Sequence, residues 1–589
     1  MNTFDAASDA PRRFRFAAAL RATWAEGYRR ADALRDIRAG LGTALVAMPL
    51  SMALAIASGV PPQYGLASAV VAGAVAAATG GSRTLVTGPT AAFAALLLPI
   101  TLRFGLAGLL TAGMMAGVIL IAMGLLGLGQ AVEYVPMPVT IGFTSGVAVV
   151  IASLQLKDFL GLNPGAQQHF LPRLAALVRA LPGFSPLDAS VGAGTLVLIL
   201  VFNRLVKRVP GLLLALSVAS AAAALLAHLR PDLRLATIGT RFHYSDASGT
   251  HPGFPAGLPG LRWPWDWPLE GQPALVLGWD SVRALLPSAV AIALLGAIAS
   301  LLAATVADGM AGQRHDPDSE LVGQGLANLV APFFGGIPAS GAIARTAAAI
   351  RDGSRSPVTA LVHAVAVGAI LLVLAPLAAW LPMASLAALL LVVAWNMSEA
   401  RHFAGILKVG RWGDRLVLLT CFSLTVLFDM TIGVIAGVLL AALFLIRRLG
   451  ELGNSRLLAP GDPGLPRGLD LPADVRVFQV EGTLLFGAAG KTLLPLARYD
   501  RAFHRLVLDL SPVRSMDISG LVALEDVVRE LREKGTVVSV AASSRSALDL
   551  LARSTYFSDP HHGPPVYGSL AMALGALQAA DAPPQAGRI

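Results

Sequence analysis

The stretch Asn328-Leu-Val-Ala-Pro-Phe-Phe-Gly-Gly-Ile-Pro-Ala-Ser-Gly-Ala-Ile-Ala-Arg-Thr-Ala-Ala-Ala-Ile-Arg351 decides how the rest of the chain is interpreted. An apolar segment breaks at Gly335, Gly336 and Pro338, and a short helical pattern then begins beside Arg345. Proline and glycine interrupt helices because proline lacks an amide donor and glycine gains the most freedom outside a helix. The pattern is typical of a broken membrane helix whose second half begins with free backbone amides.

The overall composition excludes an ordinary soluble protein. Of the 589 residues, 55% are hydrophobic and 14% are charged, which is typical of a chain that crosses a membrane many times. The net charge of +9 comes from short basic clusters between apolar segments, so it indicates membrane topology, and no nucleic-acid partner is expected. The single cysteine, Cys421, excludes an internal disulfide and a cysteine metal cluster. Because catalytic and metal-binding motifs are also missing, we expect no enzyme activity, no metal and no cofactor.

Two sets of apolar segments follow one another along the chain. The first set covers 41–58, 66–82, 89–102, 105–127, 136–156, 188–205 and 211–228. The second set covers 286–308, 321–334, 340–351, 357–380, 383–398, 414–429 and 431–447. Several segments are too short to cross a bilayer alone. The pattern predicts a polytopic α-helical membrane protein with 14 spans, arranged as 7+7.

Basic residues set the expected orientation. Residues 1–38 are arginine-rich and lack the compact apolar core of a signal peptide, so this region is expected in the cytoplasm. Further basic residues follow the even-numbered segments from the sixth onward: Arg204, Lys207, Arg208, Arg314, Arg351, Arg355, Arg401, Lys408, Arg411, Arg415, Arg447 and Arg448. Since loops rich in lysine and arginine stay on the cytoplasmic side, we expect a multi-pass protein of the bacterial inner membrane.

The composition also predicts domain boundaries. A transmembrane domain is expected over 39–450, with an extracytoplasmic insert at 229–285. A linker rich in glycine and proline follows at 451–473. Alternating strand and helix patterns then predict a small cytoplasmic α/β domain over 474–580, with a tail at 581–589.

A second break lies at Thr87-Gly-Pro-Thr90, in the first set of segments. Pro89 suits the first position of a helix, and a short apolar run to Leu102 follows it. Transporters built from inverted repeats carry such broken segments at corresponding positions of their two halves. Two half-helices that meet at their N-termini present unpaired amides and two positive dipole ends, which can hold an anion. The two breaks therefore predict an anion transporter.

Several motifs occur in a fixed order along the chain. They are Pro49-Leu-Ser-Met-Ala53, Gly59-Val-Pro-Pro62 with Gly65-Leu66, Thr87-Gly-Pro-Thr90, Ala307-Asp-Gly309 with His315, Glu320-Leu-Val-Gly-Gln-Gly325 with Asn328, Phe334-Gly-Gly336 through Arg345-Thr346, and Asp517-Ile-Ser-Gly520. Through them the chain resembles the SulP anion transporters, the bacterial relatives of solute carrier family twenty-six, with a C-terminal STAS domain. The resemblance implies two intertwined inverted repeats, a core domain that moves against a gate domain in an elevator-like cycle, and a homodimer.

The expected substrate-binding residues come from both breaks and from the first span. They are Leu50, Leu54, Gly88, Pro89, Thr90, Ala91, Gly341, Ala342, Ile343, Ala344 and Arg345. Arg345 adds a full positive charge near the anion, or else it lies at the cytoplasmic end of a short helix, where it reports topology or pairs with an acid. The Thr90 hydroxyl either donates to the anion or caps its own helix.

The coupling position departs from the family pattern. Many relatives carry an acidic residue in the eighth span, in a Glu-Ser-Leu-Leu-like run, whereas this chain has Ala299-Ser-Leu-Leu302. A buried carboxylate can couple proton or sodium flow to transport, and alanine cannot. Transport is therefore uncoupled or an exchange, Asp308 has taken over the coupling role, or Ala299 is an engineered substitution.

The expected pocket is apolar. Leu50 and Leu54 stand where relatives often have glutamine and an aromatic residue, and Ala342 and Ala344 where some have serine. Because a strongly hydrated dianion needs many donors to replace its water, this composition disfavours sulfate. Chloride, bicarbonate and a small carboxylate stay open.

In the STAS-like domain, Ser519 of the Asp517-Ile-Ser-Gly520 motif is the candidate regulatory residue. It matches the position that is phosphorylated in related anti-sigma-factor antagonists. A phosphate there would lie at a helix N-terminus, where negative charge is favourable. The alternative is that Ser519 is simply an N-cap serine.

Taken together, these features predict a membrane transporter of small anions such as bicarbonate, chloride, sulfate or a small dicarboxylate. One alternative is a nucleobase permease of the same architecture, which would need a carboxylate where this chain has Ala299 or Ala344. Another is an anion-sensing membrane protein that signals through Ser519. A channel-like mode with the same residues is also open. The expected partners are the small anion, the lipid bilayer and a second copy of the chain.

Overall fold

The structure is a computed structural model of the 589-residue chain. It describes residues 16–130, 135–165, 167, 169–205, 210–230, 233, 235–246, 249–267, 275–428, 430–450, 454–458, 462, 465, 474–485, 492–493, 496, 504–559, 561 and 563–581. The first part of the N-terminal region, most of the predicted linker and most of the predicted tail lie outside the described residues. The chain forms two compact units, Met1–Val438 and Leu439–Ile589.

Each of the predicted apolar segments has a helical counterpart. The first set corresponds to α2 (Arg30–Ala57), α3 (Pro62–Thr79), α4 (Ala91–Leu125), α6 (Met137–Phe159), α8 (Pro186–Leu205) and α9 (Gly211–Leu229). The second set corresponds to α11 (Trp279–Ala311), α12 (Pro317–Val330), α13 (Ile343–Arg351), α14 (Val358–Ala378), α15 (Met383–Met397), α17 (Trp412–Leu427) and α18 (Met430–Gly450). Two predicted segments share α4, which is broken at Gly105, where φ is 71°.

The membrane unit is therefore a mostly helical, polytopic fold, as predicted. Within the described residues, 9 helices are long and apolar enough to cross a membrane by length and composition. The shorter α12, α13 and α17 fall below that length, so the count of fourteen spans stays a prediction. Helices α7 (Phe170–Ala180) and α16 (Ala400–Val409) were not predicted. The insert holds α10 (Ile238–Arg241) and a hairpin of β2 (His243–Asp246) and β3 (Gly249–Pro252).

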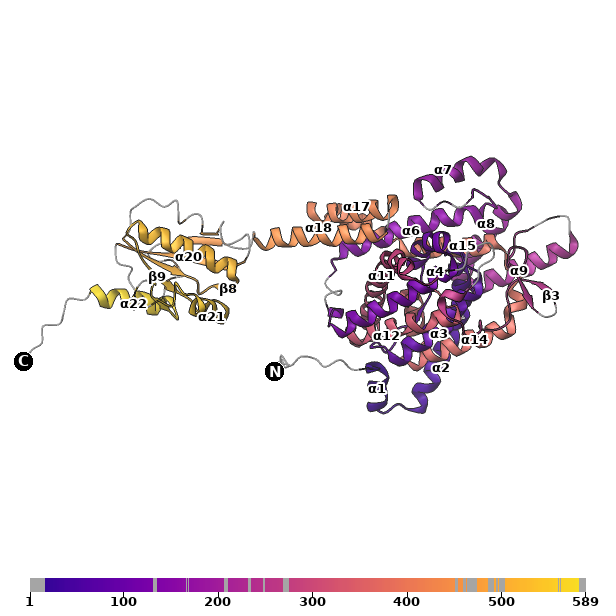
Figure 1. The fold of residues 1–589 in the computed structure, drawn as a ribbon, viewed down its shortest axis with the longest axis horizontal. Helices are drawn as coiled ribbons and strands as arrows, with labels where there is room; N and C mark the ends of the chain where they lie inside the picture. The colour runs from indigo at the N-terminus through magenta and orange to yellow at the C-terminus, as the bar shows by residue number, and fades with distance from the viewer. Residues whose placement is uncertain are drawn as a thin grey trace, which may run out of the picture. The chain divides into compact units, whose positions relative to one another are not determined.

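The contacts between helices divide this unit into two bundles, and Figure 1 labels members of both, among them α3, α4 and α12 of one and α6, α8 and α15 of the other. The core bundle consists of α2, α3, α4, α11, α12, α13 and α14, and the gate bundle of α6, α8, α9, α15 and α17. Small residues allow the close crossings that membrane helices need. In the core, a Cβ atom on Gly117 of α4 would lie 2.6 Å from the carbonyl oxygen of Gly325 in α12. In the gate, one on Gly142 of α6 would lie 2.6 Å from the carbonyl oxygen of Leu418 in α17.

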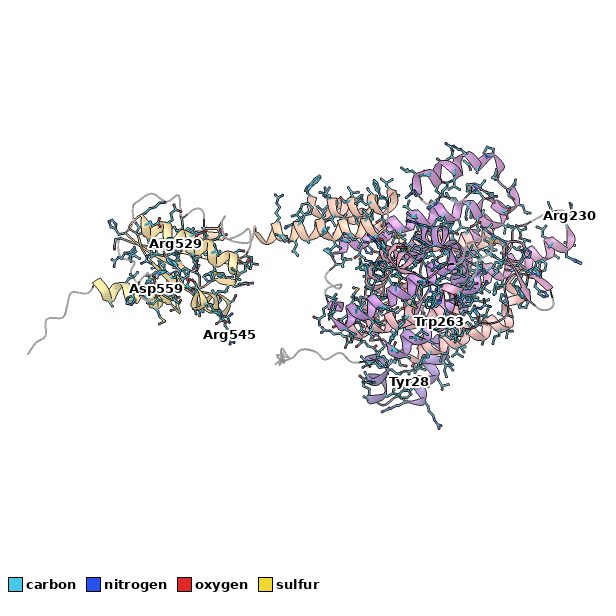
Figure 2. All side chains as sticks on the ribbon, in the orientation of Figure 1. Tyr28, Arg230, Trp263, Arg529, Arg545 and Asp559 are labelled. Atoms are coloured by element: carbon cyan, nitrogen blue, oxygen red, sulfur yellow. The ribbon has the colours of Figure 1, made fainter. Side chains whose placement is uncertain are left out.

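The N-terminal region is attached to the core bundle through Asp36. Helix α1 (Ala18–Ala25) precedes α2, and Tyr28, labelled in Figure 2, donates a hydrogen bond to the Asp36 carboxylate at 2.8 Å. The same carboxylate accepts from the backbone N–H of Arg355 at 2.9 Å and from the Thr359 hydroxyl at 2.9 Å. Burial and the neighbouring carboxylate raise the pKa of Tyr28 to about 12. Hydrogen bonds through Asp36 therefore connect the N-terminal region to the loop that follows α13.

The two sequence breaks meet in space. Strand β1 (Thr87–Gly88) pairs antiparallel with β4 (Ser340–Gly341), with Thr87 opposite Gly341 and Gly88 opposite Ser340. Helix α4 begins shortly after β1, and α13 begins shortly after β4. The short pairing therefore brings the starts of the two half-helices together, as the inverted-repeat interpretation predicts.

The second unit contains the predicted α/β domain, built on a six-stranded sheet. The strands are β5 (Asn454–Leu458), β6 (Val475–Leu484), β7 (Arg505–Asp509), β8 (Val513–Met516), β9 (Val537–Ala541) and β10 (Val566–Tyr567). The sheet order is β10-β9-β7-β6-β5, and β8 pairs with β6. Helices α20 (Ile518–Glu533) and α21 (Arg545–Arg553) cover one face, and α22 (Leu570–Asp581) covers the other.

One boundary of this domain needs correction. Strand β5 falls within the predicted linker, 451–473, yet it pairs antiparallel with β6 along its whole length. Leu458 is buried against the apolar face that α22 covers. The composition around β5 suggested a linker because a single short strand between glycines and prolines has too little periodicity to be recognised, and only its pairing with β6 defines it.

Candidate functional site

Three polar side chains of α12 hold the loops that lead into the two half-helices. Gln324 donates to the Thr87 hydroxyl at 2.6 Å and to the Glu320 carboxylate at 2.8 Å. Asn328 donates to the carbonyl of Ala339 at 2.9 Å and accepts from the amide of Ala339 at 2.8 Å. Glu320, Gln324 and Asn328 are four residues apart, so they lie on one face of the helix. This buried row positions β1 and β4 and thereby both half-helix starts.

Both half-helices begin without a side-chain cap. Helix α4 has Thr90 at its N-cap and α13 has Ala342, and no side chain in the described part of the chain accepts from their first-turn amides. The Thr90 hydroxyl instead pairs with the Ser340 hydroxyl at 2.9 Å. The alternative that Thr90 caps its own helix is therefore wrong, although Thr90 does occupy the N-cap position. The first-turn amides stay available to a ligand.

Arg345 lies in the first turn of α13 and is 2% exposed. Its Nη2 donates to the carbonyl of Pro89 at 2.7 Å and to the Ser51 hydroxyl at 3.3 Å. Its Nε and Nη1 have no hydrogen-bond partner, and it forms no ion pair with any residue that the structure describes. Among the described residues no acid forms an ion pair with the buried guanidinium, so the alternative that Arg345 pairs with an acid is wrong for this structure. The alternative that Arg345 only reports topology stays a prediction.

Gly88 lies behind this guanidinium. A Cβ atom on Gly88 would overlap Nη1 of Arg345, so the close approach requires glycine here. Gly88 thus shapes the position of Arg345 without lining the cavity described next.

A cavity of about 270 Å³ lies between the core bundle and the gate bundle. Its core wall contains ten of the eleven predicted substrate-binding residues, all but Gly88: Leu50, Leu54, Pro89, Thr90, Ala91, Gly341, Ala342, Ile343, Ala344 and Arg345. Residues from α2, from both breaks and from the two half-helices are thus brought together at one place. Most of these side chains are apolar, so the polar groups of the core wall are Arg345, Thr90 and the backbone amides.

The two predicted coupling residues lie in different environments. Ala299 lines the cavity, and its neighbour Ser300 is fully buried and accepts a hydrogen bond from the Gly341 amide at 3.0 Å. Asp308, near the end of α11, does not line the cavity. It accepts hydrogen bonds from the His315 amide at 2.8 Å and contacts Nδ1 of the same residue at 2.7 Å. Among the residues that the structure describes, the core wall therefore has no carboxylate.

The gate wall was missed by the sequence analysis. It contributes Thr140, Phe143, Thr144, Val393, Asn396, Met397 and Glu399 to the cavity. Polar residues four apart within an apolar segment, such as Thr140 and Thr144, are a signal that could have found one part of it. Glu399 follows the end of α15 and carries the carboxylate of this wall.

Ser519 is exposed in the first turn of α20. The N-cap of this helix is Asp517, whose carboxylate accepts from the Gly520 amide at 2.7 Å, so the interpretation of Ser519 as an N-cap serine is wrong. The two residues are close in sequence, and the aspartate is the one with the extended backbone that an N-cap needs. Further along α20 lies Arg529, which is labelled in Figure 2. Its guanidinium carbon lies 5.4 Å from the centroid of the Tyr556 ring.

The fold and the cavity define a class of protein. Two packed bundles of membrane helices, with two half-helix N-termini directed at a cavity between them, are the architecture of broken-helix membrane transporters. The chain belongs to the sulfate permease family, whose sequence profile matches residues 34–420. Residues 470–573 match the STAS domain. The resemblance seen in the motifs is thereby confirmed.

Relatives of similar length support this membership. The chain is 39% identical to YvdB of Bacillus subtilis (strain 168), for which sulfate transport is assigned provisionally, over 90% of this chain and 96% of the relative. It is 30% identical to the bicarbonate transporter BicA of Picosynechococcus sp. (strain ATCC 27264 / PCC 7002 / PR-6), over 88% of this chain and 90% of the relative.

Solved structures agree on the fold. The transmembrane domain of a cyanobacterial BicA superposes with a TM-score of 0.57 at 28% identity, covering 70% of this chain and 98% of that one. Murine Slc26a9 in the inward-facing state superposes with a TM-score of 0.80 at 19% identity, covering 98% of this chain and 97% of that one. At 19% identity, the similarity to Slc26a9 supports the fold alone.

Proposed function

We propose that this protein transports small anions and that it binds them between the starts of α4 and α13. The observation that carries the proposal is the guanidinium of Arg345, which is 2% exposed and whose Nε and Nη1 have no hydrogen-bond partner among the described residues. Burying a charge without a counter-ion costs free energy. A bound anion would supply that counter-ion to Arg345. The two half-helix N-termini add partial positive charge at the same place.

The cavity suits a small anion that loses part of its water. A volume of about 270 Å³ accepts chloride, bicarbonate, sulfate or a small dicarboxylate. The apolar core wall by itself disfavours a strongly hydrated dianion, but the gate wall adds the hydroxyls of Thr140 and Thr144 and the amide of Asn396. Relatives named for sulfate and for bicarbonate support either substrate.

The transport cycle that fits this architecture is an elevator-like one. The core bundle carries Arg345 and both half-helices, and the gate bundle carries only the opposite wall, so a movement of one bundle along the other exposes the anion on alternate sides. With Ala299 in the coupling position, the cycle runs as uncoupled transport or exchange. The proposed setting is the bacterial inner membrane, with the N-terminus and the STAS domain in the cytoplasm and two chains in a homodimer.

The test is uptake by purified protein in proteoliposomes. Labelled chloride, bicarbonate, sulfate and fumarate are compared, with and without an imposed proton or sodium gradient. We expect saturable uptake of at least one anion that neither gradient drives uphill. Uptake of a nucleobase in place of anions would support the permease alternative, and specific anion binding without any flux would support a sensor.

A further inference from the structure

The gate wall of the cavity contains a carboxylate, which the proposed function does not use. Glu399 lines the cavity from the corner between α15 and α16, together with Asn396 and Met397. Its side chain is 38% exposed, so it can exchange a proton with water. A cavity that is proposed to hold an anion thus has a cation on one wall and an acid on the other.

The backbone at Glu399 indicates that its position matters. Its φ of 44° and ψ of 38° lie in the left-handed region, which is unfavourable for a residue with a Cβ atom. Among the described residues, the only other one with a side chain and a positive φ is Ala17. The preceding carbonyl, that of Ser398, accepts a hydrogen bond from Ser145 of α6 at 2.5 Å. This hydrogen bond to α6 holds the strained corner in place. Backbone strain of this kind concentrates at functional positions.

The charged and titratable side chains nearest to Glu399 lie on its own turn and across the cavity. On its own turn, Nδ1 of His402 lies 3.2 Å from a Glu399 oxygen, and this histidine is well exposed. Across the cavity lies Arg345. Helix α6, which packs against α16, contributes the uncharged Thr140 and Thr144 to the cavity.

Helix α17 also packs against α16. The charged residues at its start form hydrogen bonds with the turn that connects the two helices. Arg415 donates to the carbonyls of Gly410 and Lys408, at 2.8 Å and 3.1 Å. Asp414 accepts from the backbone N–H of Arg411 at 3.3 Å. None of the four charged residues Lys408, Arg411, Asp414 and Arg415 lines the cavity, so Glu399 is the carboxylate of the cavity among the described residues.

We propose that Glu399 is a gate-wall carboxylate that controls anion entry to the cavity, and this rests on the proposed function. When Glu399 is ionised it repels an anion held near Arg345, and when it is protonated that repulsion disappears. Glu399 belongs to the gate bundle, which does not carry the site, so its proton stays behind when the core bundle moves. Acid therefore accelerates transport without driving it uphill.

The experiment measures uptake of labelled chloride and labelled sulfate by full-length protein in proteoliposomes at about pH 7 and about pH 4, a range that brackets the pH at which carboxylic side chains ordinarily gain a proton. Neither anion changes charge in this range. We expect acid to raise the initial rate of the wild type by about fivefold. E399Q should be fast at both pH values. A proton gradient should change the rate and leave the final accumulation unchanged.

Matched variants separate the alternatives. E399D keeps the charge and should keep the acid stimulation, and H402Q should keep it too, because the histidine does not line the cavity. D352N, which changes an exposed acid after α13, should behave as the wild type. Acid stimulation that persists in E399Q, a wild type that ignores pH, or an E399Q protein that binds anions but no longer transports them would overturn the proposal. Absence of anion uptake and binding in the wild type at every pH would instead overturn the proposed function itself, and this inference with it.

Discussion

Two arginines, one in each unit of the chain, show how differently the same side chain can be used. Arg345 in the membrane unit is 2% exposed, contacts a carbonyl and a hydroxyl, and leaves Nε and Nη1 unpaired. Arg505 in the STAS domain lies at the start of β7 and binds both oxygens of Asp474, at 2.6 Å and 2.9 Å. The first charge forms no ion pair with any side chain that the structure describes, and the second forms an ion pair with the Asp474 carboxylate.

The difference separates a ligand-binding role from a structural one. A protein that buries a cation without a partner gives up stability, and such a loss persists where it serves binding. A bidentate pair at the start of a strand needs no ligand, because its two charges compensate each other. We therefore expect changes at Arg345 to affect anion binding and changes at the Asp474–Arg505 pair to affect only folding.

The largest effect is expected from Arg345→Met, which removes the charge and keeps much of the side-chain volume. Loss of a buried, hydrogen-bonded charge from a site costs about 2 kcal/mol or more, roughly 30-fold in affinity. The melting temperature should rise or stay unchanged, because an uncompensated buried charge disappears. Isothermal titration with the transported anion and a thermal melt of the same sample measure both. Arg351→Met, on the exposed end of α13, is the control; a large fall in melting temperature for Arg345→Met would mean that the guanidinium is structural.

The next effect is expected from Gly88→Ala. The new methyl group would overlap Nη1 of Arg345 and displace the guanidinium, although Arg345 itself is intact. Overpacking of this kind costs about 1 to 3 kcal/mol, and here we expect most of it to appear as weaker anion binding. Gly368→Ala in α14 is the control, since its methyl group would meet Val70 at an ordinary 3.8 Å. Equal affinities for Gly88→Ala and the wild type would show that the position of Arg345 is unimportant.

A smaller effect is expected from Thr90→Val, which keeps the shape of the side chain and removes its hydroxyl. The bond to the Ser340 hydroxyl across the two breaks would be lost, at a cost of about 1 kcal/mol or roughly fivefold in affinity. Initial uptake rates over a range of anion concentrations measure this change. Thr101→Val in the same helix is the control, because that hydroxyl bonds to the carbonyl of Leu97. Similar affinity losses for both variants would make the effect a general one of α4.

The smallest effect is expected in the STAS domain. The hydrogen bonds from Arg505 hold the pKa of Asp474 below its ordinary value. A carboxyl whose pKa is lowered by folding stabilises the folded state above the unfolded-state pKa, and the stabilisation disappears as the pH falls through the folded-state pKa. Asp474→Asn should therefore lower the melting temperature slightly near neutral pH and shrink the further loss on acidification. Anion affinity should not change, and Asp526→Asn, at an exposed position of α20, should alter neither property.

Much of the core wall could be predicted from the sequence because its residues lie at interruptions. Glycines and prolines at Thr87–Thr90 and Gly335–Gly341 mark broken helices, and these local signals need no knowledge of packing. The gate wall could not be predicted in the same way. Glu399 follows an ordinary apolar segment, and only the left-handed corner at its backbone and the packing of α15 on α6 place it at the cavity.

The hydrogen-bond partner of a polar side chain likewise could not be predicted from the sequence. Thr90 occupies the position of a cap, and its hydroxyl was equally suited to bond its own helix; the bond to Ser340 depends on β1 lying beside β4. The same holds for Ser519, because the choice of Asp517 as N-cap is made by the backbone conformation at the helix start. Strand β5 likewise could be recognised only from its pairing with β6.

By itself, the sequence determined the class of fold, the two breaks, the STAS-like domain and the cation at the start of α13, because hydrophobic periodicity and helix-breaking residues act locally along the chain. The tertiary structure alone decided that Arg345 has no acidic partner among the described residues, that Gly88 lies behind its guanidinium, and that Glu399 faces the same cavity from the other bundle. These are relations between segments far apart in sequence. Charge compensation and cavity lining depend on distances in space, and only the packing of the two bundles sets those distances.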